Sequence, residues 1–200
     1  MFSPFTPRRF VMLGRPVLKG WVVAVAIAGL SLTMMGEARA VGFGVKGGVG
    51  LLQKEDPYFG TTAGPTLWMV GGYVDIGGVA SSRVRITPSL EYSSRSGTKI
   101  TSVSLEGRFQ FYRSPKAVVY AGIGPGVNVK QEVAQVPGPS GVLVSQTRRR
   151  TQGSLNVPVG VEWKLGKGGW RWTFEMKMAI ADNQKDSAYR IGTGFAFSIK

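Results

Sequence analysis

The residues best suited to chemistry are charged side chains that recur at alternate positions in the last 160 residues. They stand between apolar neighbours in a pattern of period two. Because carboxylates and cations on one face of a sheet can form ion pairs, this spacing predicts a charge network. We assign to it Lys46, Arg85, Glu91, Glu106, Arg108, Glu162, Lys164, Arg171, Glu175, Lys177 and Arg190, and Asp75 lies on the same face.

Two residue types that most enzymes depend on are missing. The chain has no histidine, which is the commonest general base and metal ligand, and no cysteine for disulfides or thiolate sites. A Ser–Lys pair remains conceivable, but no signature supports one. Gly-x-Gly patterns fall within predicted strands rather than between a strand and a helix, so they do not indicate dinucleotide sites. We expect no catalytic residues, no metal and no cofactor.

A run of three arginines, Arg148, Arg149 and Arg150, is the second candidate for binding chemistry. It falls in residues 131–154, which we interpret as the longest loop of the chain. A loop of that length is either functional or disordered. Arginine clusters bind phosphate well, so the run suggests a phosphate contact, and a solvated run of charges is the alternative.

The elements that must position these residues are β-strands. Eight segments alternate between apolar and polar residues, and no long segment shows the helical period of 3.6. The segments are 41–52, 67–77, 84–92, 101–111, 117–129, 155–165, 170–180 and 189–200. Pro65 marks an expected bulge at the start of the second segment. The links between segments alternate between long and short, as in an up-and-down antiparallel barrel.

Alternation alone does not tell which face of the barrel points outward. A soluble lipocalin-like barrel has an apolar interior, whereas a membrane barrel turns its apolar face toward lipid. We favour the membrane barrel because the charged face is rich in glycine and serine, which leave room inside eight strands for a few long side chains. Its charges are also mixed in sign. Bulky aromatic residues near the segment ends suggest girdles: Trp68, Tyr92, Trp163, Trp170, Trp172, Tyr189 and Phe197.

The first 40 residues have the pattern of a secretory signal peptide. Basic residues precede the apolar run 21–35, and an Ala-x-Ala site ends at Ala40. The run is shorter than the roughly 20 residues of a membrane-spanning helix. Met12 is a plausible true start, since it would give the signal a usual length. We therefore expect residues 1–40 to be a signal peptide and residues 41–200 to be the barrel domain.

The predicted strands resemble those of the small outer-membrane β-barrel family, which includes the barrel of outer-membrane protein A and the opacity-type proteins. The similar segments are Tyr120-Ala-Gly-Ile-Gly-Pro-Gly, Val159-Gly-Val-Glu-Trp-Lys-Leu, Trp172-Thr-Phe-Glu-Met-Lys-Met and Ile191-Gly-Thr-Gly-Phe-Ala-Phe-Ser-Ile. The last resembles the closing strand that the barrel assembly machinery recognises. The chain departs from the family by ending in Ile199-Lys200 rather than in an aromatic residue.

The resemblance implies a non-enzymatic outer-membrane barrel with a filled interior and a structural, interaction or adhesion role at the cell surface. The partners it implies are outer-membrane lipid, lipopolysaccharide and, during assembly, the barrel assembly machinery. We expect no nucleic-acid partner, because the net charge of +10 over residues 41–200 belongs to an exported chain. The alternatives are a soluble periplasmic barrel that binds an apolar ligand, a lipid-modifying hydrolase and a small pore.

Overall fold

A computed structural model describes residues 40–56, 60–77, 83–95, 97–137, 142–182 and 187–199. They form eight strands in chain order. The strands are β1 (Ala40–Asp56), β2 (Gly60–Gly77), β3 (Val84–Arg95), β4 (Thr98–Arg113), β5 (Ala117–Pro137), β6 (Leu143–Lys164), β7 (Trp170–Ala181) and β8 (Ala188–Ile199). The expected signal peptide lies outside the described residues except for Ala40. Within the described residues, no helix has the length and apolar character to cross a membrane.

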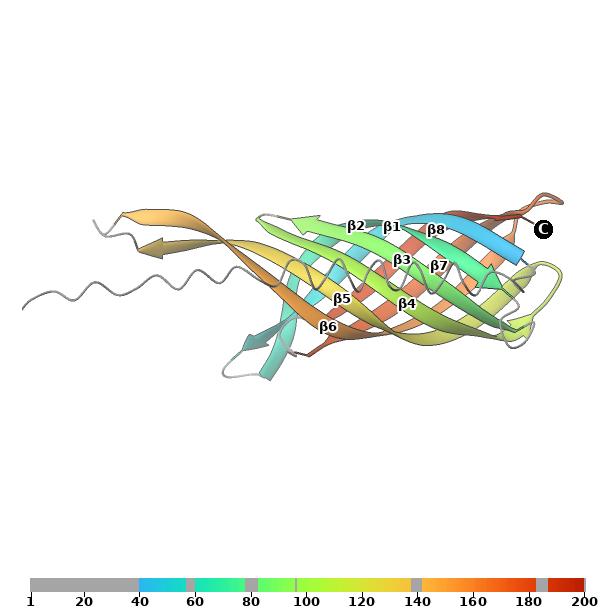
Figure 1. Cartoon of the computed structure of the whole chain (residues 1–200), viewed down its shortest axis with the longest axis horizontal. Coiled ribbons are helices and arrows are strands. Elements are labelled where there is room, and N and C mark those ends of the chain that lie inside the picture. Colours follow the sequence, from blue (N-terminus) through green and yellow to red (C-terminus); the bar gives the residue numbers. More distant parts are fainter. Residues whose placement is uncertain are drawn as a thin grey trace, which may run out of the picture.

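The strands close into a single antiparallel barrel, so the predicted eight-stranded fold is confirmed (Figure 1). Each strand pairs with the next one along the chain. The barrel is closed by β1 and β8, whose pairing runs from Val41↔Ile199 to Leu52↔Ala188. Within the barrel wall, closure gives the backbone groups of each strand a partner on both sides and leaves no open edge.

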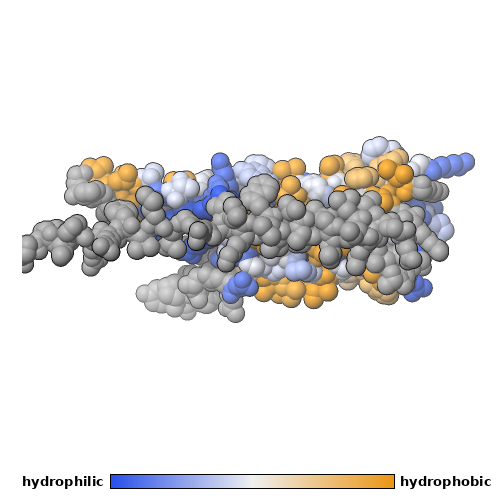
Figure 2. Space-filling model, viewed as in Figure 1, coloured by the Kyte–Doolittle hydropathy of each residue, from blue (hydrophilic) through white to orange (hydrophobic). Residues whose placement is uncertain are grey.

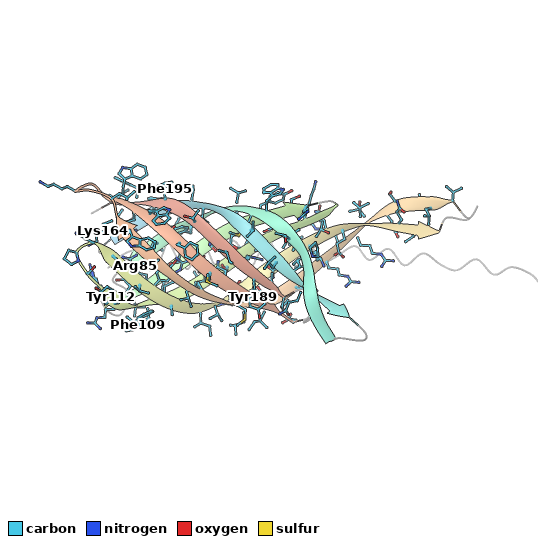
Figure 3. The ribbon with its side chains drawn as sticks, turned by 180° about the vertical axis from the view of Figure 1, so that it is seen from behind. Arg85, Phe109, Tyr112, Lys164, Tyr189 and Phe195 are labelled. Carbon is cyan, nitrogen blue, oxygen red and sulfur yellow. The ribbon has the colours of Figure 1, made fainter. Side chains whose placement is uncertain are left out.

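The apolar face of the barrel points outward. The outer side chains of Val45, Ile123 and Phe195 are 64%, 58% and 52% exposed, whereas Glu91 and Glu106 are 2% and 0% exposed. Figure 2 shows apolar side chains on the outer wall, and Figure 3 shows Phe195 and Phe109 there. A soluble barrel would have the opposite arrangement, because water excludes apolar surface and solvates charge.

The strand β2 begins at Gly60 rather than at Leu67, and it contains the expected bulge. Gln53 pairs with Ala63 and Leu51 pairs with Thr66, so Gly64 and Pro65 together face Leu52. Proline lacks an N–H for the ladder, and a bulge is a position where that loss is tolerated.

The prediction of a long loop at residues 131–154 is wrong. β5 continues to Pro137 and β6 starts at Leu143, and their pairing extends from Lys130↔Arg150 to Pro137↔Leu143. The hairpin projects beyond the other strands, at the end of the barrel opposite the C-terminus (Figure 1). Residues 142–151 are all exposed, so no buried face imposes the alternation by which strands are recognised in a sequence.

We name the two ends of the barrel for the arguments below. The hairpin end is the end with the β5–β6 hairpin. The terminal rim is the opposite end, where β1 begins, β8 ends, and short turns join β4 to β5 and β6 to β7. The β6–β7 turn contains Gly166 at φ 67°, a backbone conformation that favours glycine.

Candidate functional site: the charged interior and the exposed hairpin

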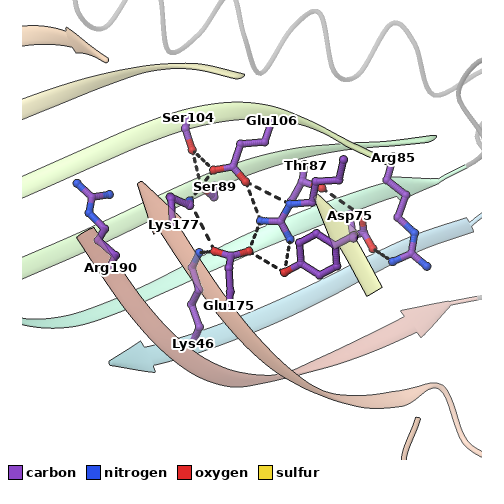
Figure 4. A network of polar contacts seen from close by, with 12 residues as sticks. Lys46, Asp75, Arg85, Thr87, Ser89, Ser104, Glu106, Glu175, Lys177 and Arg190 are labelled. Carbon is purple, nitrogen blue, oxygen red and sulfur yellow. Dashed lines mark hydrogen bonds and ion pairs between the residues drawn. The ribbon is translucent and has the colours of Figure 1, made fainter. Parts of the chain in front are cut away.

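Glu175 on β7 lies at the centre of the charged interior. Lys46 Nζ is 2.6 Å from its Oε1 and Arg108 Nη2 is 2.7 Å from its Oε2. The Tyr120 hydroxyl donates a hydrogen bond of 2.8 Å to Oε2. Both carboxylate oxygens therefore have cationic or hydroxyl partners from other strands (Figure 4).

Glu91 and Glu106 extend this cluster to β3 and β4. Lys177 Nζ lies 2.5 Å from a carboxylate oxygen of each of them, so it bridges the two. Glu91 also pairs with Lys46 at 2.6 Å and with Arg190 at 2.5 Å. The central cluster comprises four cations and three carboxylates: Lys46, Arg108, Lys177, Arg190, Glu91, Glu106 and Glu175.

A second cluster lies nearer the terminal rim and pairs two carboxylates with two arginines. Asp75 is 2.6 Å from Arg85, and Glu162 is 2.5 Å from Arg171. Crossed contacts of 3.1 Å between Arg85 and Glu162 and 3.5 Å between Arg171 and Asp75 complete the set. Thr87 donates a hydrogen bond to Asp75. With Tyr120 of β5, which bonds to Glu175, the two clusters draw side chains from all eight strands. They therefore join parts of the barrel wall that are far apart in sequence.

Glycine on the inner face provides the space for these side chains. A Cβ at Gly44 would collide with the ring of Tyr73, and one at Gly160 would collide with the ring of Tyr120. The guanidinium of Arg108 lies 5.4 Å from the centre of the first ring and 4.9 Å from the centre of the second. At these separations both rings can attract the cation.

An apolar layer lies inside the barrel toward the hairpin end. It consists of the buried side chains Leu52, Leu67, Ile100 and Ala188. Ala188 is two residues along β8 from Arg190, and Ile100 is two residues along β4 from Ser102, which accepts a hydrogen bond from Arg190. The layer therefore lies just beyond the central cluster and separates it from the hairpin end.

The structure places ten of the eleven predicted network residues inside the barrel, and Lys164 requires a correction. Lys164 is on the inward side of β6 by alternation, but it is the last residue of that strand and its side chain is exposed. Three polar side chains are closely integrated with the network although the prediction left them out. They are Asp75, Tyr73 and Tyr120, and all three stood on the charged face in the sequence pattern.

The three arginines are exposed on β6 where it extends past the barrel wall. Arg150, Arg149 and Arg148 pair across the hairpin with Lys130, Gln131 and Glu132, respectively. The strand β7 ends opposite Ser154, so among the described residues no strand lies on the other side of this arginine run. These arginines are not brought together with the internal network.

Aromatic side chains gather near both ends of the apolar belt. Trp68 and Tyr92 contact each other near the hairpin end, with ring centroids 5.5 Å apart. Trp163 stacks on Trp172 at 4.6 Å near the terminal rim, where the rings of Trp170 and Phe197 are 5.2 Å apart. Tyr189 is exposed near the hairpin end. Two aromatic zones separated by an apolar band match the two water interfaces of a membrane.

The carboxylates and cations of the interior neutralise one another. Its carboxylates are buried and paired, and none is presented to a substrate from solvent. Within the described residues, no group of three or more histidine, cysteine, aspartate or glutamate side chains is arranged to hold a metal ion. The interior therefore has the features of a stabilising core built from charges.

No protein-family model and no curated protein matches the sequence. Among solved structures, the N-terminal β-barrel domain of Pseudomonas aeruginosa OprF is similar with a TM-score of 0.56 at 10% identity, over 79% of this chain and 97% of that chain. Neisserial surface protein A is similar with a TM-score of 0.55 at 11% identity, over 78% of this chain and 96% of that chain. Ail of Yersinia pestis is similar with a TM-score of 0.51 at 13% identity, over 79% of this chain and 98% of that chain. The chain therefore has the eight-stranded fold of the small outer-membrane β-barrels.

Proposed function

We propose that this chain is a non-enzymatic integral outer-membrane protein with a structural or adhesive role at the cell surface. The observation that carries the proposal is the outward apolar belt around a filled, charged interior. Such a surface is stable against hydrocarbon and unfavourable in water. The similar solved barrels support the same placement.

The alternative of a soluble periplasmic barrel for an apolar ligand is not favoured. A ligand of that kind needs an apolar cavity, whereas Glu106, Glu175 and Lys177 occupy the middle of this interior. Osmotic shock would release a soluble barrel, but a membrane barrel requires detergent.

Fractionation combined with a heat-modifiable gel tests the proposal. The protein should remain in the outer-membrane fraction and be extracted by detergent. It should then migrate differently on a gel before and after boiling, because a closed barrel resists unfolding until it is heated. Recovery in the osmotic-shock fluid, with the same migration under both conditions, would contradict the proposal.

The hairpin is the part of the molecule that we assign to contact at the cell surface. It carries the three arginines just beyond the end of the barrel wall. The aromatic residues Trp68 and Tyr92 lie near this end of the wall, so the arginines are at the depth expected for lipid head groups. Arginine binds phosphate through several hydrogen-bond donors in a fixed geometry. We assign Arg148, Arg149 and Arg150 to contact with lipopolysaccharide phosphates.

Replacing these three arginines by glutamine tests the contact. Binding of lipopolysaccharide to the protein in detergent should weaken at least tenfold, and the loss should shrink at high salt. The matched control replaces Arg113, Lys116 and Lys167, which are exposed at the terminal rim, and removes the same charge. Equal effects of the two variants would show that charge alone, rather than the hairpin, determines binding.

A further inference from the structure

Positive charge is unevenly distributed along the barrel, and the terminal rim holds a surplus of it. Arg113, Lys116, Lys164 and Lys167 are exposed there. Of the acidic residues in the described part of the chain, none is exposed at this rim. By contrast, the described residues of the hairpin end include Glu132 and Asp182.

The two carboxylates nearest the rim do not neutralise this surplus. Asp75 and Glu162 are buried in the barrel, and each contacts both Arg85 and Arg171. Their charge is therefore matched inside. The side chains of Arg113, Lys116, Lys164 and Lys167 are exposed, and no ion pair joins them to an acidic residue in the described part of the chain. An anionic partner outside the protein would complement them.

Exposed aromatic and apolar side chains alternate with the basic ones. Tyr112 precedes Arg113 and is 55% exposed, and Trp170 follows the turn that carries Lys167 and is 53% exposed. Trp163 and Leu165 flank Lys164 in sequence. Rings at the edge of an apolar belt with basic groups just beyond them place those groups at the depth of lipid head groups. This position distinguishes a lipid partner from a soluble polyanion, which would not need the rings.

We infer that the terminal rim is a binding surface for the head groups of anionic glycerophospholipids in the leaflet that surrounds it. The inference rests on the proposed membrane placement. A Lys or Arg close to an anionic membrane surface strengthens binding about fivefold. Several such residues around one rim should enrich anionic lipid next to it.

The tryptophans of the chain provide a built-in reporter. Trp163, Trp170 and Trp172 lie near the terminal rim, whereas Trp68 lies toward the hairpin end. The full chain with Trp21→Phe and Trp68→Phe would be purified from membranes and reconstituted in vesicles. Quenching of its fluorescence by brominated phosphatidylglycerol, relative to brominated phosphatidylcholine, measures which lipid occupies the rim.

The expected result is a preference for phosphatidylglycerol of about threefold or more, because each basic residue contributes and salt screens part of it. Arg113→Gln, Lys116→Gln, Lys164→Gln and Lys167→Gln together should bring the ratio close to one. Exchanging arginine and lysine at the same positions should preserve it. Glutamine at Arg148, Arg149 and Arg150 should leave it unchanged.

Three outcomes would overturn the inference. Equal quenching by the two lipids in the parent protein, or an unchanged preference in the fourfold glutamine variant, would overturn it while leaving the membrane placement intact. No quenching by either lipid would overturn the membrane placement along with it. Heat-modifiable migration of every variant distinguishes a loss of lipid preference from a loss of folding.

Discussion

Replacing Glu175 by glutamine is the most direct test of the charged core. The side chain keeps its size, so the change removes charge with little change in packing. Lys46 and Arg108 each lose an ionic partner at 2.6 and 2.7 Å. The central cluster then contains four cations and two carboxylates within a wall of low polarity. Tyr120 still has an acceptor for its hydroxyl hydrogen.

The size of the effect follows from what remains around the two cations. Breaking a buried ion pair by removing one partner costs about 3–5 kcal/mol. Lys46 keeps Glu91 at 2.6 Å and Arg108 keeps Glu106 at 2.7 Å. Neither cation is left without a partner, so we expect the lower end of that range, a loss of about 3 kcal/mol in the free energy of unfolding.

Urea unfolding in lipid vesicles, followed by tryptophan fluorescence, measures this loss. The matched control is Glu132→Gln on the hairpin, which removes an ion pair with Lys130 of 2.7 Å in which the glutamate side chain is 41% exposed. An exposed pair is worth less than about 1 kcal/mol. If Glu175→Gln and Glu132→Gln reduced stability equally at unchanged urea dependence, the interior charges would not form a stabilising core.

Three further predictions concern the interior. Gly44→Ala should destabilise the barrel by about 1–3 kcal/mol because its Cβ meets the Tyr73 ring. Gly47→Ala, where only a backbone oxygen lies 3.6 Å away, should change stability by less than about 0.5 kcal/mol, and urea unfolding would compare the two. Lys164→Gln should have a similarly small effect on stability, because this side chain is exposed. Lys177→Gln should lower the free energy of unfolding by about 3 kcal/mol or more, because it breaks two buried ion pairs. Equal losses in the two variants would mean that Lys164 belongs to the network after all. Planar bilayers containing the protein should show no discrete channel currents, because buried side chains fill the interior; regular single-channel steps would contradict this.

The sequence predicted correctly which side chains of each strand point inward, because each side of the barrel wall accepts only certain residue types. A residue on the outer side meets an apolar environment, and one on the inner side meets a narrow interior, so alternation persists over each strand core. Leu67 and Met69, for example, stand on the same side of the alternating pattern as Asp75, and both are buried inside the barrel. The contact of Leu67 with the other residues of the apolar layer could not be predicted, because it depends on the register between strands and alternation carries no information on register.

Lys164 and the hairpin show where this reasoning stops. Alternation tells which side of the wall a residue occupies, but not its height along the barrel, so a lysine at the mouth and a lysine inside have the same signature. Beyond the wall, no face of the β5–β6 ribbon is buried against an apolar core, and its two strands are joined by backbone pairing. Periodicity of side chains carries no information about such strands, which is why residues 131–154 were interpreted as a loop.

The distribution of charge along the barrel follows from the cost of removing charge from water. Inside the wall, six cations and five carboxylates nearly cancel, because an unmatched charge there would be strongly destabilising. At the two ends, charged groups are solvated and need not be paired, so most of the net positive charge is located there. The terminal rim accumulates basic residues without exposed acidic ones among the described residues, whereas the hairpin end mixes both signs. A difference between two ends that are equally free to carry charge does not arise from folding requirements alone, and the proposed contact of the terminal rim with anionic lipid would account for it.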